Sequence, residues 1–261
     1  MKKYVNLFVF IFMVGTCFSQ NKAQTKSAVS YKNPVVDIAM PDPTVIKAAD
    51  GYFYVYATES TRNVPIMKSK DLVQWTFCNT AFTNKTRPRF EPKAGIWAPD
   101  INYINNKYVL YYAMSVWGGE QTCGIGVATA DSPQGPFTDH GKMFRSNEIG
   151  VQNSIDPSFL QYEGRNYLVW GSFRGIYVIE LTEDGLSLKP GAEKKRIAGT
   201  AFEAAYIHKH GDYYYMFASI GSCCEGIRST YKVVVGRSKK VWGPYKDKSG
   251  KPMLKNGYSL V

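Results

Sequence analysis

The chain has 261 residues, of which 44% are hydrophobic and 20% charged, with a formal net charge of +11 at pH 7. After an N-terminal apolar run, about 240 residues remain without a second such run, which is enough to bury one core and excludes a transmembrane segment there. The basic residues are scattered, so we expect a solvated basic surface and no nucleic-acid partner, with weak attraction to anionic cell-wall material as the alternative.

The first residues predict an export signal. Lys2 and Lys3 give a positive start, an apolar run extends from Val5 to Val14, and small or polar residues follow as far as Ser19. This order is typical of a signal peptide, which we place over residues 1–19. The protein is therefore expected to be secreted or periplasmic.

Cys17 leaves a less favoured alternative open. The stretch from Val14 to Cys17 loosely resembles a lipoprotein processing site, which would anchor the protein to a membrane through a lipid. Beyond the signal, no low-complexity stretch divides the chain. We therefore expect a linker over residues 20–32 and one domain over residues 33–261.

Aromatic residues make up 15% of the chain, and Tyr alone occurs 19 times, which favours strands over helices. Four aromatic-rich segments resemble one another and are predicted to be strands: 51–58, 107–114, 165–172 and 212–219. Near its end each has an aromatic residue, at Tyr56, Tyr112, Trp170 and Phe217, with intervals of 56, 58 and 47 residues. Sheets of about four strands that repeat in this way predict the blades of an all-β propeller.

One acidic residue precedes each repeated strand. Asp42, Asp100, Asp156 and Glu203 lie 14, 12, 14 and 14 residues before the aromatic residue of their unit. Because the innermost strand of every blade lines the axis, we expect the four acids to meet there. Carboxylates brought together separate in pKa, so that some stay protonated while others ionise. The repeat therefore predicts an acid-base site on the axis.

Four cysteines follow the signal: Cys78, Cys123, Cys223 and Cys224. The chain has no Cys-x-x-Cys pair for zinc, and neighbours such as Cys223 and Cys224 rarely bond to each other. We therefore expect structural or free thiols, with the redox state of the adjacent pair left open.

Four motifs together resemble glycoside hydrolase family 43, whose members are five-bladed propellers that act on arabinose and xylose polymers. They are Pro41–Pro43, Trp97–Asp100, Asn153–Ser158 and Phe202–Ala204. The resemblance extends from about residue 33 to the end. Three further stretches are most similar to arabinan endo-1,5-α-L-arabinosidases: 170–177, 221–226 and 229–238. The resemblance implies a secreted hydrolase that cleaves α-1,5-arabinofuranosyl linkages, with plant cell-wall arabinan as the partner.

The resemblance also implies residue roles in an inverting mechanism. Asp42 would be the general base, Glu203 the general acid, and Asp156 the carboxylate that orients the acid and keeps its pKa high. Trp97 would supply either a sugar platform or a wall of the channel. Asn153 would bind the sugar or a buried water, and the family leaves Asp100 as a structural residue.

The chain departs from the family pattern after the fourth repeat. Family members continue into a fifth blade, whose His near the axis helps to hold calcium or another ion, and no such His follows Glu203 in the right unit here. We therefore expect four blades with a stub of the fifth, an incomplete metal site and no cofactor required for the chemistry. An exo-acting arabinofuranosidase or β-xylosidase, and an inactive carbohydrate-binding propeller, remain as alternatives.

Overall fold

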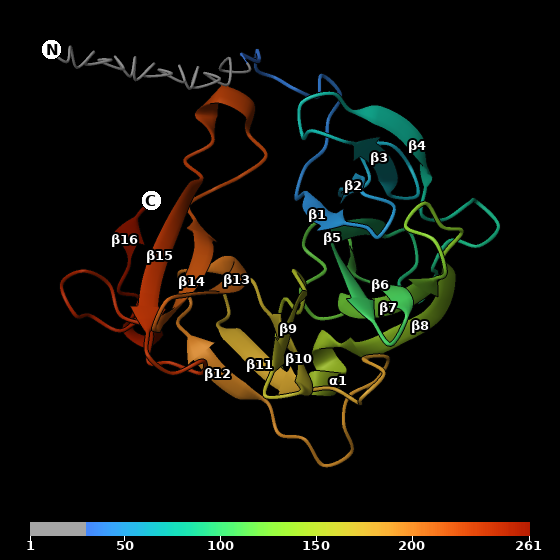
Figure 1. The fold of residues 1–261 in the computed structure, drawn as a ribbon. Helices are drawn as coiled ribbons and strands as arrows, with labels where there is room; N and C mark the ends of the chain where they lie inside the picture. The colour runs from blue at the N-terminus through green and yellow to red at the C-terminus, as the bar shows by residue number, and fades with distance from the viewer. Residues whose placement is uncertain (1–29) are drawn as a thin grey trace, which may run out of the picture. The chain divides into compact units, whose positions relative to one another are not determined.

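A computed structural model describes residues 30–261, and residues 33–261 form one compact unit (Figure 1). The predicted signal peptide, Cys17 and nearly all of the predicted linker lie outside the described residues. Among residues 30–261, no helix has the length and apolar character needed to cross a membrane.

The described residues form four antiparallel sheets of four strands each, with the strands of every sheet in chain order. The first two sheets contain β1 (Thr44–Lys47), β2 (Phe53–Tyr56), β3 (Pro65–Ser69), β4 (Thr76–Thr80), β5 (Gly95–Ile104), β6 (Lys107–Ser115), β7 (Gly124–Ala130) and β8 (Thr138–Arg145). The last two contain β9 (Ser158–Tyr162), β10 (Arg165–Trp170), β11 (Ile176–Glu180), β12 (Lys195–Ala198), β13 (Glu203–His210), β14 (Tyr213–Ile220), β15 (Lys232–Ser238) and β16 (Ser259–Leu260). Short helical turns are α1 (Ser146–Ile149), η1 (Gly226–Arg228) and η2 (Met253–Lys255). The predicted propeller of four blades is confirmed, and the four repeated segments are the second strands, β2, β6, β10 and β14.

The last strand differs from the expectation for the end of the chain. β16 pairs with β15, so that Val234 lies opposite Leu260 and Val235 opposite Ser259. The final residues therefore complete the fourth blade, where we expected a stub of the fifth. The outer edge of β15 needs a hydrogen-bonding partner, and β16 supplies it.

Neighbouring blades are joined by apolar layers between their faces. Tyr54 and Tyr56 of β2 alternate along the strand and are fully buried against blade 2. A second cluster joins blades 2 and 3 around Trp170, and a third joins blades 3 and 4 around Phe202 and Val234. This packing holds β1, β5, β9 and β13 as the innermost strands, around a common centre (Figure 1).

The start of each inner strand has an unusual backbone. Asp42, Ala98, Asp156 and Ala204 all have positive φ, at 49°, 41°, 57° and 51°. β-bulges follow between Trp97 and Asp100 and between Glu203 and Tyr206. Positive φ is uncommon for residues other than Gly and clusters at functional sites. The same unusual backbone therefore recurs at the start of all four inner strands, and it determines the direction in which the side chains there point.

Candidate functional site

Three carboxylates lie at this end of the inner strands. Asp42 and Asp156 each precede an inner strand by two residues, and Glu203 is the first residue of β13. Burial raises the pKa of Asp156 well above its usual range, and the charges of Glu203 and Asp42 raise it further. The structure therefore brings together Asp42, Asp156 and Glu203, the three residues predicted to be catalytic.

Asp42 is exposed and is held by the hydroxyl of Thr58, which donates a hydrogen bond to its Oδ2 atom. The same Thr58 oxygen accepts a hydrogen bond from the backbone N–H of Ala98 at 2.7 Å. Since Ala98 follows Trp97 directly, this contact places the predicted aromatic platform beside Asp42. An exposed carboxylate with a fixed orientation suits a general base that acts on water.

Asp156, the second carboxylate, contacts the segment that carries the third, Glu203. Its Oδ2 accepts a hydrogen bond from the backbone N–H of Ala204 at 3.2 Å, and Ala204 directly follows Glu203. Because burial and two nearby negative charges all favour the neutral form, Asp156 keeps its proton to higher pH than a free aspartate.

Glu203 is buried, with 9% of its surface exposed, and its Oε2 accepts a hydrogen bond from Ser172 Oγ at 2.8 Å. Burial raises the pKa of Glu203, the charge of Asp42 adds to this, and the hydroxyls of Ser172 and Tyr231 oppose it. The net effect is a carboxyl that holds its proton better than an exposed glutamate, as a general acid must.

Asn153 hydrogen-bonds Ser172, which in turn hydrogen-bonds Glu203. Its Nδ2 donates to Ser172 Oγ at 2.9 Å and to the Ser172 carbonyl at 3.2 Å. Its Oδ1 lies 4.0 Å from Cys123 Sγ, a weak donor. Both ends of the amide thus have protein partners, and the predicted contact of Asn153 with sugar or a buried water stays a prediction.

Asp100 does not join the other three acids, so the expectation that four carboxylates meet was wrong. Its carboxylate accepts hydrogen bonds from Phe159 N and Asn102 Nδ2, both at 2.7 Å, and from Thr44 Oγ1 at 3.5 Å. Its offset of 12 residues is the reason, because the residue 14 positions before Tyr112 is Ala98. Burial raises the pKa of Asp100 to about 6.

Trp97 has an aromatic neighbour that the sequence did not reveal. Its ring centroid is 5.6 Å from that of Trp117, with the planes tilted by 50°, and Trp117 is 78% exposed. Trp117 lies in the loop after β6, whose last residue Ser115 pairs with Gly95 at the start of β5. A half-buried and an exposed indole together form an apolar surface near Asp42.

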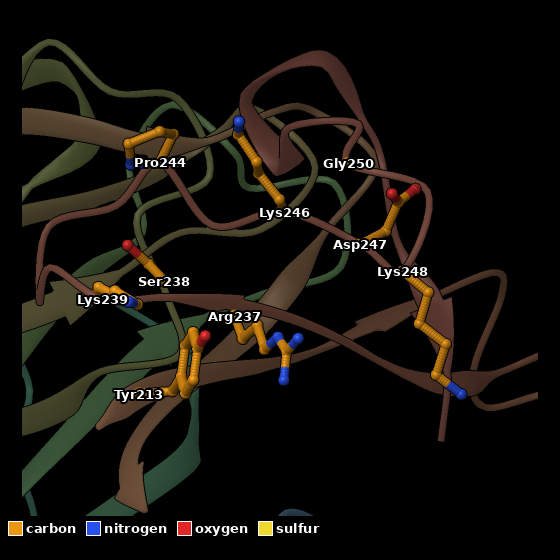
Figure 2. Close-up of a pocket in the computed structure, with 9 residues that line it drawn as sticks. All are labelled: Tyr213, Arg237, Ser238, Lys239, Pro244, Lys246, Asp247, Lys248 and Gly250. Atoms are coloured by element: carbon orange, nitrogen blue, oxygen red, sulfur yellow. The ribbon is translucent and has the colours of Figure 1, made fainter. Parts of the chain in front are cut away.

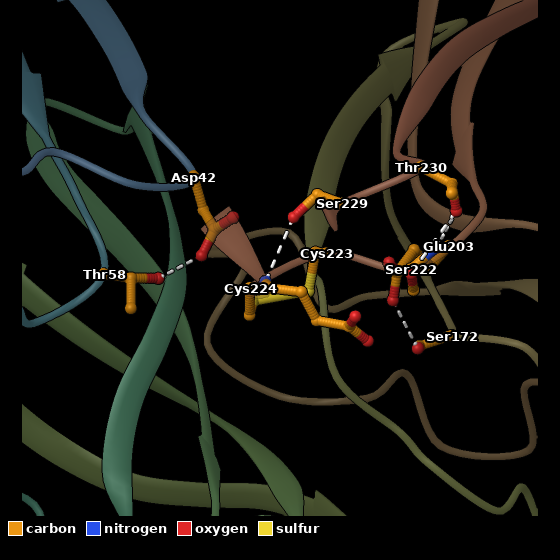
Figure 3. The surroundings of a disulfide bond; sticks show 10 residues. Asp42, Thr58, Ser172, Glu203, Ser222, Cys223, Cys224, Ser229 and Thr230 are labelled. Carbon is orange, nitrogen blue, oxygen red and sulfur yellow. Dashed lines mark hydrogen bonds between the residues drawn. A yellow bond between two sulfur atoms is a disulfide. The ribbon is translucent and has the colours of Figure 1, made fainter. Parts of the chain in front are cut away.

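The cysteine expectation is corrected by the structure. Cys223 and Cys224 form a disulfide with each other, while Cys78 and Cys123 are free. Figure 3 shows this bond with the Asp42 and Glu203 side chains around it. Both cysteines lie in the loop that follows β14.

The incomplete site for an axial ion, which the family resemblance led us to expect, stays a prediction. Within residues 30–261, no group of three or more His, Cys, Asp or Glu side chains is placed to hold a metal. His140 pairs with Thr129 Oγ1 in blade 2, and His208 and His210 are exposed on β13.

A hollow of about 360 Å³ lies elsewhere, at the outer strands of blade 4 (Figure 2). Arg237 lies 4.5 Å from the centre of the Tyr213 ring, and Lys239 lies near the same ring. Asp247, its one acidic lining residue, is bound to its own turn through Ser249 and Lys251. This basic hollow is separate from the three carboxylates.

Comparison with known proteins gives consistent matches. Residues 31–259 match the model of glycosyl hydrolases family 43. The chain is 38% identical over 234 residues to an extracellular endo-α-(1→5)-L-arabinanase of Bacillus subtilis, over 84% of this chain and 71% of that protein. It is 34% identical over 248 residues to an extracellular exo-α-(1→5)-L-arabinofuranosidase of Cellvibrio japonicus, over 84% and 70%. A solved α-L-arabinanase of Cellvibrio cellulosa, complexed with arabinohexaose, has a TM-score of 0.78 and 32% identity, over 86% of this chain and 78% of that chain.

Proposed function

Because the chain belongs to glycosyl hydrolase family 43, we propose that it cleaves α-1,5-linked arabinofuranosyl bonds within arabinan and inverts the anomeric centre. The observation that carries this proposal is the grouping of three carboxylates in which burial and mutual charge favour the protonated form of Asp156 and Glu203. Glycosidic cleavage needs both a protonated and an ionised carboxyl in one site.

In the proposed reaction, Glu203 donates its proton to the glycosidic oxygen as the bond to the anomeric carbon breaks. Asp42, oriented by Thr58, takes a proton from the water that attacks the opposite face of the sugar. Asp156 lies next to both and, through the Ala204 N–H, fixes the start of β13 that carries the acid. In the substrate complex we expect the Asp42 and Glu203 carboxyls to be roughly 6.5–9.5 Å apart, which leaves room for the water.

Endo action is the finer part of the proposal. It is supported by the 38% identity to an endo-acting relative and by the Trp97–Trp117 surface, which offers contact area for sugars beyond the bond that is cut. Exo action is the second candidate, because the chain is also 34% identical to an exo-acting relative. The extracellular relatives, together with the N-terminal signal, support secretion and a polymeric cell-wall substrate.

Incubation with linear arabinan tests the proposal directly. We expect the viscosity to fall and arabino-oligosaccharides to appear before free arabinose, whereas an exo enzyme releases arabinose from the first minutes. Wild-type protein that binds arabinan without turnover would instead be a carbohydrate-binding propeller.

Substitution of the two proposed catalysts separates their roles. Asp42→Ala and Glu203→Ala should each lower kcat on arabinan by about 10²–10⁴-fold. On an arabino-oligosaccharide with an acidic phenol as leaving group, Glu203→Ala should recover much of the activity, because that oxygen needs no proton, while Asp42→Ala should not. Asp131→Ala removes an exposed carboxylate that pairs with Lys107, and it serves as the control. Equal losses for both variants on both substrates would refute the assignment.

A further inference from the structure

The disulfide lies at the end of blade 4 that carries Glu203. Within this blade, Glu203 pairs directly with Ser219 of β14. β14 ends one residue later, at Ile220, and Cys223 and Cys224 follow in the loop that leads to β15. The strand register therefore places the start of the loop that carries the disulfide next to Glu203.

The far end of the same loop also contacts the acid. The hydroxyl of Tyr231, the last residue before β15, lies near enough to the Glu203 carboxylate to lower the pKa of Glu203, and burial together with that carboxylate raises the pKa of Tyr231. In Figure 3, Asp42 lies on one side of the disulfide and Glu203 on the other. The surroundings of the disulfide thus include both the proposed base and the proposed acid.

Hydrogen bonds within the loop hold it in shape. The backbone N–H of Ser222 donates to Thr230 Oγ1, and the Thr230 N–H donates to the Ser222 carbonyl, both at 3.0 Å. The Glu225 N–H donates to Ser229 Oγ at 3.0 Å, and the turn η1 lies between these two residues. A loop braced in this way presents a surface of fixed shape, which lowers the entropy lost when a ligand binds.

The exposed part of this loop is chemically apolar at the disulfide. Cys223 is half-buried and Cys224 is exposed. Disulfide sulfur atoms are polarisable and offer neither a charge nor a strong hydrogen-bond donor. Sugar-binding pockets combine such apolar walls with a few polar groups, and a pentose ring has an apolar face to lay against them. The carboxylates supply the polar groups here.

We propose that the Cys223–Cys224 disulfide is a substrate-binding wall, against which a sugar ring of arabinan packs while its glycosidic bond lies between Asp42 and Glu203. The inference rests on the proposed function and adds a binding element to it. It assigns the adjacent cysteines a role in substrate affinity, with the proton transfers left to the carboxylates.

The double variant Cys223→Ser/Cys224→Ser tests this role. We expect KM for arabino-oligosaccharides to rise by roughly tenfold, the size of effect that loss of one small apolar contact produces, with kcat within about threefold of wild type. Cys78→Ser, which alters a free thiol in blade 1, is the matched control and should change neither value. Cleavage of the disulfide in the wild-type protein with a water-soluble phosphine should raise KM in the same way and leave the double variant unaffected.

The outcomes separate the inference from the function on which it rests. If the wild-type protein hydrolyses no arabinan, the proposed function fails and the inference fails with it. If the wild type is active but the double variant and the reduced protein keep their KM within about twofold, the inference alone is overturned. A loss confined to kcat also overturns it, because the loop would then act by positioning Glu203 through Tyr231. If the double variant does not fold, as judged by its melting temperature, the KM of the reduced wild-type protein decides between these outcomes.

Discussion

At the scale of single residues, the protonation of Glu203 depends on a short chain of hydrogen bonds. Asn153 holds Ser172, and Ser172 donates to the Glu203 carboxylate. A hydrogen bond to the charged form of an acid favours ionisation, so Ser172 lowers the pKa of Glu203 against the effect of burial. Ser172 thus tunes the acid without touching the bond that breaks.

Replacement of Ser172 by Ala should therefore raise the pKa of Glu203 further. The acid then stays protonated to higher pH, so the alkaline limb of the pH profile of kcat/KM should move to higher pH. Loss of the positioning contact should lower kcat by about two- to tenfold. Initial rates on arabino-oligosaccharides across the pH range measure both effects.

Ser238→Ala provides the control for this experiment, because Ser238 is also a buried serine but its hydroxyl accepts from the Lys240 N–H in blade 4. It should leave the pH profile unchanged. An alkaline limb that stays in place in Ser172→Ala, or moves to lower pH, would show that the hydroxyl does not act on Glu203.

At the scale of secondary-structure elements, Asp100 links three inner strands. It belongs to β5, accepts from the N–H of Phe159 in β9, and contacts Thr44 of β1. Burial raises the pKa of Asp100 to about 6, above the usual range of an aspartate. The folded protein therefore binds this proton more tightly than the unfolded chain, and stability falls as pH rises from about 4 through 6.

Asp100→Asn should remove this pH dependence while it keeps an acceptor for the Phe159 N–H. At pH 4 the variant should match the wild type in free energy of unfolding. At pH 7.5 it should be more stable, by at most about 3 kcal/mol and by less to the extent that water reaches the half-buried carboxylate. Denaturant unfolding at both pH values measures the difference, and equal stabilities at both would contradict the raised pKa.

The inner strands also show how much of the site could be predicted from the sequence. The spacing of 14 residues identified Asp42, Asp156 and Glu203, because each repeated strand carries the same backbone register into its blade. Asp100 fell outside the cluster because a displacement of two residues keeps the side chain on the same face of a strand but moves it about 7 Å along the strand. In this repeat, the offset of an acid from the repeated strand predicted whether it belongs to the site better than its residue type did.

The loops were far less predictable from the sequence. Ser172 follows Trp170 of the third repeat closely, so its spacing was a usable signal for a residue near the acids. Trp117 and the Cys223–Cys224 bond carried no such signal, since their positions depend on how a loop folds back. Loop conformation follows from contacts that the local sequence does not encode.

At the scale of the whole domain, the apolar clusters within residues 30–261 join blade 1 to 2, blade 2 to 3 and blade 3 to 4, and none joins blade 4 to blade 1. Blades 2 and 3 are therefore packed on both faces, whereas blade 4 leaves Val233 half exposed beside the buried Val234. In arrays where each unit contacts only its neighbours, stability is a sum of unit and interface terms.

The blades should accordingly differ in local stability, and their second strands offer a matched comparison. β6 and β14 are each hydrogen-bonded to a strand on both sides, but β6 is buried along nearly its whole length while β14 is half-buried at most positions. We expect backbone amides of β14 to exchange with deuterium at least about tenfold faster than those of β6, since opening blade 4 breaks one interface and opening blade 2 breaks two. Hydrogen exchange read by mass spectrometry resolves the two strands. Equal protection of the two strands would mean that the flank of blade 4 is covered in solution. Addition of arabino-oligosaccharide should then leave the exchange rates of β14 unchanged. If the flank is open, β14 should gain protection when the ligand bridges Asp42 and Glu203.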